Sequence, residues 1–300
     1  MAEARVELEA SLYERLGVRH LALKVSSITS RIDPMGLDAA LERTLPRAAR
    51  IAEAAARCGG SLVLDAESSD DLELTLRLLE ALAADPRFAD VDLGFALQAY
   101  LVDARAITDR LLAIGHARYE RKARPLRVRL VKGANLGLER IRASLRGHPS
   151  AVHADKDATD RAAQALLELL ASKEHTHAVH VALGSHNLFD VAHALVHRAA
   201  EALDDALSFE VLAGLADPLV RALRALDVDV RVYLPVVDPE ERNAAVAYLA
   251  RRLDEQSAPA HFLPSSLAAD RARDPYAEHR ARYLRITSEA PLPPPRLAAR

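Results

Sequence analysis

The run Arg129-Leu130-Val131-Lys132-Gly133-Ala134-Asn135 carries the features that decide the fold. Its apolar residues are typical of a strand buried in a parallel sheet, and Lys132 lies where that strand would end. In α/β barrels the carboxyl ends of the strands carry the chemistry. The run therefore predicts a parallel strand that presents cations at one rim of a barrel.

Short apolar runs alternate with longer amphipathic ones along most of the chain. This alternation predicts a parallel sheet with crossover helices. In one expected helix, Leu72, Leu76 and Leu79 share a face. The expected strands are His20–Ser26, Ser61–Ala66, Leu93–Ala99, Arg127–Gly133, Ala178–Ser185, Ser208–Gly214 and Asp229–Val236.

The pattern gives seven strand–helix units, whereas a closed (β/α)8 barrel needs eight. Residues 1–16 predict a helix, and no strand precedes it. The expected fold class is therefore α/β, a (β/α)8 TIM-like barrel lacking its first strand–helix unit. On this interpretation the chain begins inside the first barrel helix, as a fragment, a gene with its start placed too late, or a decayed copy. The expected domains are a partial first barrel helix (1–16), the barrel (17–263) and a charged, proline-rich irregular tail (264–300).

Composition excludes several classes of protein. The chain has 300 residues, enough for one barrel of about 250 residues. Forty basic and 43 acidic residues give no global attraction to nucleic acid. The single cysteine, Cys58, excludes a disulfide framework and is expected to be a structural thiol. Without an apolar run of about 18–20 residues or a secretory signal, we expect a cytoplasmic protein.

Polar side chains follow the expected strands, and a barrel gathers such residues at one mouth. Gln98 is notable because a long amide in an apolar strand is costly unless it finds partners. Further along, Arg251 and Arg252 follow Tyr248 by one turn, and the arginine fork suits a planar carboxylate. The alternative for this pair is an ordinary solvated basic face. The strand-end residues are Lys24, Asp65, Glu67, Gln98, Arg129, Lys132, His186, Asn187 and Tyr233.

Three closely spaced histidines, His175, His177 and His180, could suggest a metal site. Their spacing at an expected helix-to-strand junction gives no single facing pair. We therefore interpret them as ordinary surface histidines and expect no metal.

Eight short motifs follow one another between Leu21 and Phe262, and in this order they resemble the proline dehydrogenase family. No single motif is decisive, but their shared order is a strong signal. The motifs are Leu23-Lys24-Val25-Ser26-Ser27, Leu64-Asp65-Ala66-Glu67, Gln98-Ala99-Tyr100, Arg129-Leu130-Val131-Lys132-Gly133-Ala134, Ser185-His186-Asn187, Phe209-Glu210-Val211-Leu212-Ala213-Gly214, Tyr233-Leu234-Pro235-Val236 and Tyr248-Leu249-Ala250-Arg251-Arg252.

The resemblance implies a distorted (β/α)8 barrel that holds FAD and oxidises L-proline to 1-pyrroline-5-carboxylate. It implies a membrane quinone as electron acceptor and no nucleic-acid partner. A homo-oligomer and peripheral attachment to the inner face of the membrane stay open. The implied catalytic residues are Asp65, Tyr233 and Tyr248, the implied substrate-binding residues are Lys24, Leu212, Arg251 and Arg252, and the implied FAD-binding residues are Gln98, Arg129, Lys132, Ser185, His186, Asn187 and Glu255.

The chain also departs from the family pattern. Asn135 and Leu136 stand where many members have tyrosine and tryptophan, and Ala213 replaces a common histidine. The glutamate that the family carries on its first strand, where it pairs with an active-site arginine, has no match before Leu21. Two rival interpretations therefore stay open. One is a non-catalytic remnant or binding module, and the other is a Schiff-base barrel that uses Lys132 or Lys24.

Overall fold

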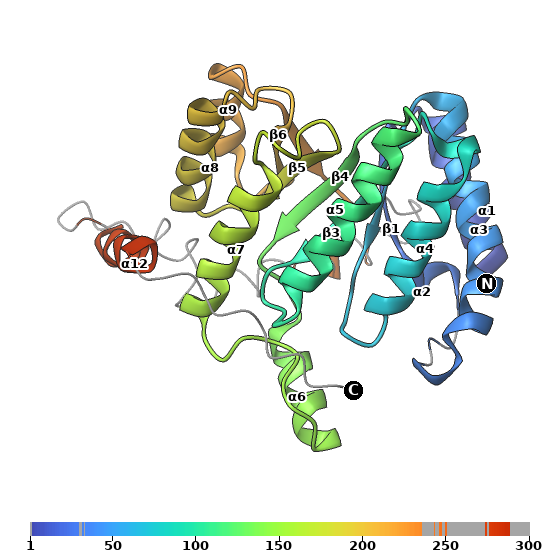
Figure 1. Ribbon diagram of the computed structural model, residues 1–300, viewed down its shortest axis with the longest axis horizontal. Coiled ribbons are helices and arrows are strands. Elements are labelled where there is room, and N and C mark those ends of the chain that lie inside the picture. The colour runs from blue at the N-terminus through green and yellow to red at the C-terminus, as the bar shows by residue number, and fades with distance from the viewer. Residues whose placement is uncertain are drawn as a thin grey trace.

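A computed structural model describes residues 2–29, 32, 34–235, 243, 246, 247, 250, 274 and 276–288. Helices and strands alternate through most of this range (Figure 1). The elements are α1 (Ala2–Leu16), β1 (His20–Lys24), α2 (Val25–Ile28), η1 (Pro34–Gly36), α3 (Leu37–Cys58), β2 (Ser61–Asp65), α4 (Leu72–Ala84), η2 (Pro86–Phe88), β3 (Asp92–Gln98), α5 (Ala104–Glu120), β4 (Leu126–Val131), α6 (Leu136–Arg146), α7 (Lys156–Leu170), β5 (Val179–Gly184), α8 (Leu188–Glu201), β6 (Leu207–Leu212), α9 (Asp217–Ala225), β7 (Val230–Tyr233) and α12 (Ala277–Ser288).

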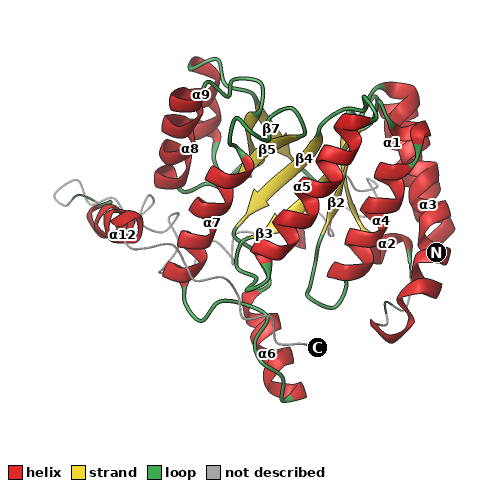
Figure 2. Cartoon of the chain, in the orientation of Figure 1, coloured by secondary structure: helices red, strands yellow, loops and turns green. Residues whose placement is uncertain are grey.

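The seven strands form one parallel sheet in the order in which they occur in the chain. The sheet curls, with β1 and β7 as its edges in the described part of the chain, and helices flank it (Figure 2). All seven strand predictions are confirmed. Six observed strands end one or two residues before the predicted end, and the seventh, β7, ends at Tyr233 where the prediction ran on to Val236, which lies outside the described residues.

The prediction for the first strand is wrong at its end. His20–Ser26 was expected, but β1 ends at Lys24 and the next four residues form the short helix α2. Val25 and Ile28, three residues apart in that turn, are both buried. The helical turn therefore places two apolar side chains in the core, which the alternation of a strand would separate onto opposite faces.

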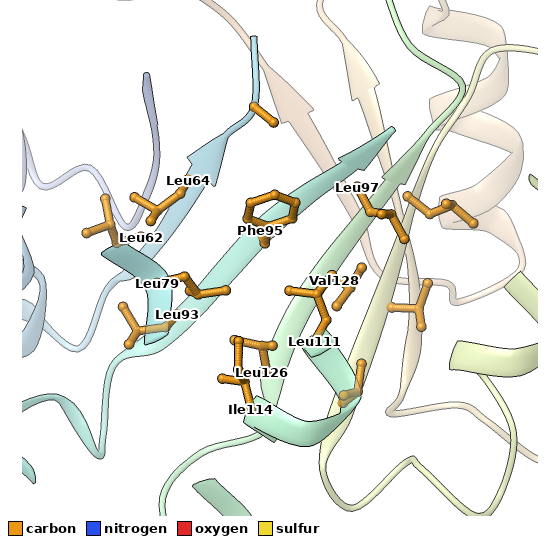
Figure 3. Packing of buried hydrophobic residues seen from close by; sticks show 14 of the residues in the cluster. Leu62, Leu64, Leu79, Leu93, Phe95, Leu97, Leu111, Ile114, Leu126 and Val128 are labelled. Atoms are coloured by element: carbon orange, nitrogen blue, oxygen red, sulfur yellow. The ribbon is translucent and has the colours of Figure 1, made fainter. Parts of the chain in front are cut away.

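The outer face of the sheet is apolar and packs against the helices. Leu93, Phe95 and Leu97 alternate along β3 and are fully buried. Leu79 of α4 and Leu111 of α5 lie in the same cluster (Figure 3). Each such side chain contributes about 1.5–3 kcal/mol when it leaves water, so this layer stabilises the sheet.

The inner, concave face of the sheet is polar instead. Because side chains alternate along a strand, residues two apart on β4 point the same way, and Arg127 and Arg129 both lie on this face. Near the amino ends of the strands, Arg127 Nε donates to Asp92 Oδ2 at 3.1 Å, and Arg231 Nη2 lies 3.3 Å from the same oxygen. Arg127 also donates to Ser208 Oγ. These four residues are called the Arg127 cluster.

Both terminal segments pack on the outside. The helix predicted for residues 1–16 is confirmed as α1, which packs against α3. Within the 264–300 segment, expected to be irregular, the chain forms α12, which packs against α7 and α8. Arg282 and Arg285 on α12 both pair with Asp157, an attraction that the local sequence does not reveal.

Among the described helices, none has the length and apolar character needed to cross a membrane.

Candidate active site

Four side chains from four strands meet at the carboxyl end of the concave face. Arg129 of β4 donates through Nη1 to Asp65 Oδ1 of β2 at 2.6 Å and through Nε to Glu210 Oε2 of β6 at 2.5 Å. Its Nη2 donates to the hydroxyl of Tyr233 on β7, and its guanidinium lies over the Tyr233 ring, 4.2 Å from the centroid. These four residues are called the Arg129 cluster.

The Arg129 cluster holds two carboxylates and one cation. Burial raises the pKa of the Asp65 carboxyl above its ordinary value, although Arg129 and Lys24 oppose the rise. Burial would lower the pKa of Arg129, but Asp65 and Glu210 outweigh it and the pKa is raised. Burial also raises the pKa of the Tyr233 hydroxyl, so that group stays protonated at neutral pH. The guanidinium is therefore permanently charged, and two carboxyl groups share it.

Lys24 lies at the end of β1, beside this cluster. Its Nζ donates to Glu67 Oε1 at 2.8 Å, and Ser26 donates to the other oxygen of the same carboxylate. Asn135 donates to the backbone carbonyl of Glu67. Burial raises the pKa of Glu67, but the hydrogen bonds from Lys24 and Ser26 outweigh it, and the pKa is lowered. Lys24 is thus held at the carboxyl end of the sheet by an ionised partner.

Lys132 lies in a second group of charges, between the ends of β4 and β5 and the helices α7 and α8. Its Nζ is 2.6 Å from Asp160 Oδ1 and 2.7 Å from Asp190 Oδ2. Lys156 and Arg282 also pair with Asp160. Burial would lower the pKa of Lys132, but Asp190 and Asp160 outweigh it and the pKa is raised. Lys132 is therefore a cation rather than a free amine.

The loop after β5 contains three of the predicted residues, and each forms a hydrogen bond within the protein. Ser185 Oγ donates to Asp190 Oδ2 at 2.8 Å, and Asn187 Oδ1 accepts from Phe189 N, which caps α8. His186 Nε2 accepts from Leu212 N at 3.0 Å, and burial lowers the pKa of this histidine. A neutral ring that accepts at Nε2 carries its proton on Nδ1. The loop therefore links the ends of β5 and β6.

Comparisons with known proteins agree with this geometry. A family model described as proline dehydrogenase matches residues 2–265.

The chain belongs to the proline dehydrogenase family.

Curated relatives and solved structures point the same way. The bifunctional protein PutA of Salmonella typhimurium is 30% identical over 263 residues, which are 84% of this chain and 19% of that protein. PutA of Rhizobium meliloti is 30% identical over 230 residues, covering 73% and 18% of the two chains. The structure of PutA from Corynebacterium freiburgense matches with a TM-score of 0.86 and 28% identity, over 98% of this chain and 29% of that one. The chain thus spans about a fifth of the length of these curated proline dehydrogenase relatives.

The described residues fit the flavin that the proline dehydrogenase family implies. Gln98, at the end of β3, is 5% exposed, and its Oε1 has no hydrogen-bond partner among the described residues. A buried acceptor of this kind needs a donor, and a flavin ring offers an imide N–H. Arg129 and Lys132 add cations on the neighbouring strand. Gln98, Arg129, Lys132, Ser185, His186 and Asn187 are therefore the described residues that would hold FAD.

The structure brings together only part of the predicted site. Asp65, Arg129 and Tyr233 are in direct contact, and Lys24 lies beside them. Leu212 pairs with Tyr233 in the register of β6 and β7, and its backbone N–H donates to His186. The predicted residues Tyr248, Arg251, Arg252 and Glu255 lie outside the described residues.

Sequence reasoning assigned no role to three carboxylates of this region. Glu210 was visible only as part of a motif, although a glutamate inside an apolar strand is the same signal that drew attention to Gln98. Asp160 and Asp190 lie on helices, and nothing in the local sequence connects them with Lys132.

Two of the three histidines expected to be ordinary surface residues, His175 and His177, lie edge-to-face with His116, whereas His180 lies on β5. His116 Nε2 lies 3.2 Å from His175 Nδ1, and the His177 ring contacts His116 and Tyr119. No group of three or more His, Cys, Asp or Glu within the described ranges is arranged to hold a metal ion.

Proposed function

We propose that this chain oxidises L-proline to 1-pyrroline-5-carboxylate with bound FAD. The observation that carries the proposal is the Arg129 cluster. A chain whose residues 2–265 match the family gathers there Asp65, Arg129 and Tyr233 from three separate strands. Bound FAD would accept a hydride from the ring carbon next to the proline nitrogen, while that nitrogen loses a proton and the C=N bond forms.

Positioning is the main contribution of the protein in this proposal. Arg129, locked by three neighbours, would present a fixed cation to the flavin, where negative charge develops on reduction. Lys132 would supply a second cation from the same strand. Gln98 would fix the orientation of the ring by accepting from it. Such preorganised groups lower the barrier because they need no rearrangement during the reaction.

For the substrate, Lys24 would grip the carboxylate together with Arg251 and Arg252. Proline has to compete with Glu67 for Lys24, so binding exchanges one ion pair for another. Leu212 and Tyr233, at the ends of β6 and β7, would shape the pocket around the ring.

The rest of the proposal rests on the family and on the strand pattern. The seven-stranded sheet is interpreted as a (β/α)8 barrel without its first strand–helix unit, with domains at 1–16, 17–263 and 264–300. We propose a membrane quinone as the electron acceptor, and a cytoplasmic protein that attaches to the membrane surface to reach it. A homo-oligomer is the assembly to test first.

The Schiff-base alternative is disfavoured by the ion pairs of its two candidate lysines. A nucleophilic lysine has to be neutral, which requires a lowered pKa. Lys132 lies between two aspartates that raise its pKa, and Lys24 is held by Glu67.

The test is the absorption spectrum of the purified protein, followed by anaerobic addition of L-proline. Bound flavin that L-proline bleaches and D-proline does not would support the proposal. Bound flavin that L-proline fails to bleach would overturn the substrate assignment. Protein that binds no added FAD would indicate the non-catalytic remnant, and borohydride trapping of a carbonyl substrate would indicate the Schiff-base barrel.

A further inference from the structure

Glu210 is a carboxylate that is almost completely shielded from water. It is 3% exposed and lies on β6, the strand between β5 and β7. Its Oε2 accepts from Arg129 Nε at 2.5 Å, while its Oε1 has no hydrogen-bond partner among the described residues. Burying a carboxylate is costly unless a cation compensates it. Arg129 supplies that compensation, so the two residues depend on each other.

Small residues on the intervening strands leave space for this contact across the sheet. β5 lies between β4 and β6, and its inward residues at this level are Ala182, which pairs with Arg129, and Gly184, which pairs with Glu210. A Cβ on Gly184 would lie 2.8 Å from Val131 Cγ1 and 3.7 Å from Arg129 Cγ. On the other side, Ala96 of β3 separates Arg129 from Asp65. Small residues thus let Arg129 reach carboxylates two strands away in both directions.

The two carboxylates bind different nitrogens of the Arg129 guanidinium, and this fixes its orientation. Glu210 holds Nε and Asp65 holds Nη1, so two carboxylates on different strands grip the same planar group. A guanidinium held at two nitrogens cannot rotate in its plane. The side chain of Glu210 is 2% exposed and that of Asp65 is 25% exposed, so Glu210 is the partner better shielded from water. Its contact is therefore the less screened of the two.

We infer that Glu210 is a positioning residue that sets the orientation and the effective charge of Arg129 toward the flavin. This inference rests on the proposed function, because it requires FAD at the carboxyl end of the sheet. Glu210 acts through Arg129, and its negative charge offsets part of the field that Arg129 would exert on a reduced, anionic flavin.

The test compares Glu210→Gln with Glu9→Gln. Glu9 is a matched control because it is also 3% exposed and also pairs with one arginine at 2.5 Å, but on α1, outside the concave face. FAD affinity of the apoprotein, the midpoint potential of bound flavin and the free energy of unfolding are measured for both variants. In Glu210→Gln we expect the FAD dissociation constant to rise about tenfold, equivalent to about 1.4 kcal/mol, and the potential to become more positive.

A merely structural role would give the opposite pattern. Glu210→Gln would then lose stability as Glu9→Gln does, with an unchanged flavin potential and a dissociation constant within about twofold of the wild type. That result would overturn the inference.

Glu210→Asp gives a second line of test should the glutamine variant fail to fold. The shorter side chain keeps the charge and loses the contact, so FAD affinity should fall while the potential stays near that of the wild type. Wild-type FAD affinity in Glu210→Asp would overturn the inference. A wild-type protein that binds no FAD would instead refute the proposed function.

Discussion

Arg127 and Arg129 lie two residues apart on β4 and point into the same concavity, yet their partners have opposite charge balances. In the Arg127 cluster two arginines share the carboxylate of Asp92. In the Arg129 cluster two carboxylates share one arginine. The Arg127 cluster therefore holds two cations and one carboxylate, whereas the Arg129 cluster holds one cation and two carboxylates.

Burial shifts the pKa of titratable groups at both ends of the concave face. Near the Arg127 cluster, burial lowers the pKa of His20, and Arg231 adds to the effect. Burial likewise lowers the pKa of His180, with Arg127 adding to it. Near the Arg129 cluster, burial raises the pKa of Asp65 instead. Burial is therefore the largest cause of the pKa shift at all three residues.

The two ends of the concave face also differ in the buried polar atoms that have no hydrogen-bond partner among the described residues. On the concave face they include the acceptors Gln98 Oε1 and Glu210 Oε1 at the carboxyl end and the donor Arg231 Nη1 at the amino end. Unmet acceptors suit a ligand that carries N–H donors, as a flavin does. We therefore propose that the ligand binds at the carboxyl end, while the clusters at both ends bridge strands.

The largest effect on stability is expected at the amino end. Asp92→Asn removes the only described carboxylate that pairs with Arg127 and Arg231, and two poorly solvated cations then repel each other. We expect the free energy of unfolding, measured by urea denaturation, to fall by about 3–5 kcal/mol. The control is Asp85→Asn, whose partner Arg87 is exposed and whose loss should cost at most about 1 kcal/mol. Equal losses would show that the Arg127 cluster does not bridge the strands.

A medium effect on stability is expected from filling the space above β5 that lets Arg129 of β4 reach Glu210 of β6. Ala182→Val adds two methyl groups to a fully buried position beside Arg129, which should cost about 1–3 kcal/mol by overpacking. The added volume should also separate Arg129 from Glu210 and weaken FAD binding. Ala182→Ser, with little added volume, is the control for both measurements. Unchanged FAD affinity in the valine variant would contradict the claim that a small residue at position 182 is needed for the contact between Arg129 and Glu210.

The smallest effect is expected at Asp65, and it depends on pH. The raised pKa means that the folded state binds the proton of this carboxyl more readily than the unfolded state does. Asp65 therefore favours folding at low pH, and this contribution is lost as pH rises through the raised pKa. Asp65→Asn cannot titrate, so its stability relative to the wild type should increase from about pH 4 upward. Unfolding measured between pH 4 and 8 tests this, and a relative stability that falls with pH would contradict it.

Much of the fold could be predicted from the sequence, for a physical reason. Short apolar runs that alternate with longer amphipathic ones are typical of a parallel sheet with crossover helices, so all seven strands were recognisable. The end of β1 was not, because the burial of Val25 and Ile28 in a helical turn depends on the surrounding core. The helix α12 was missed because ion pairs with Asp157 on α7 fix it in place.

The candidate site could likewise be predicted only in part from the sequence. Asp65, Arg129 and Tyr233 could be placed together because the carboxyl ends of parallel strands share one edge. The charge balance could not be predicted, since it depends on which carboxylates reach across the concavity. Glu210 reaches Arg129 only because β5 has Ala182 and Gly184 between them, a condition set by register rather than by local sequence.

The most direct test of the account is the FAD content of Arg129→Met beside that of Arg127→Met. Both variants shorten an inward arginine of β4, and both are compared with the wild type after equal reconstitution, with folding checked by circular dichroism. The account predicts that Arg127→Met retains FAD, because Asp92 still pairs with Arg231, and that Arg129→Met loses it. Equal FAD content in the two folded variants would contradict the assignment of the ligand to the carboxyl end of the sheet.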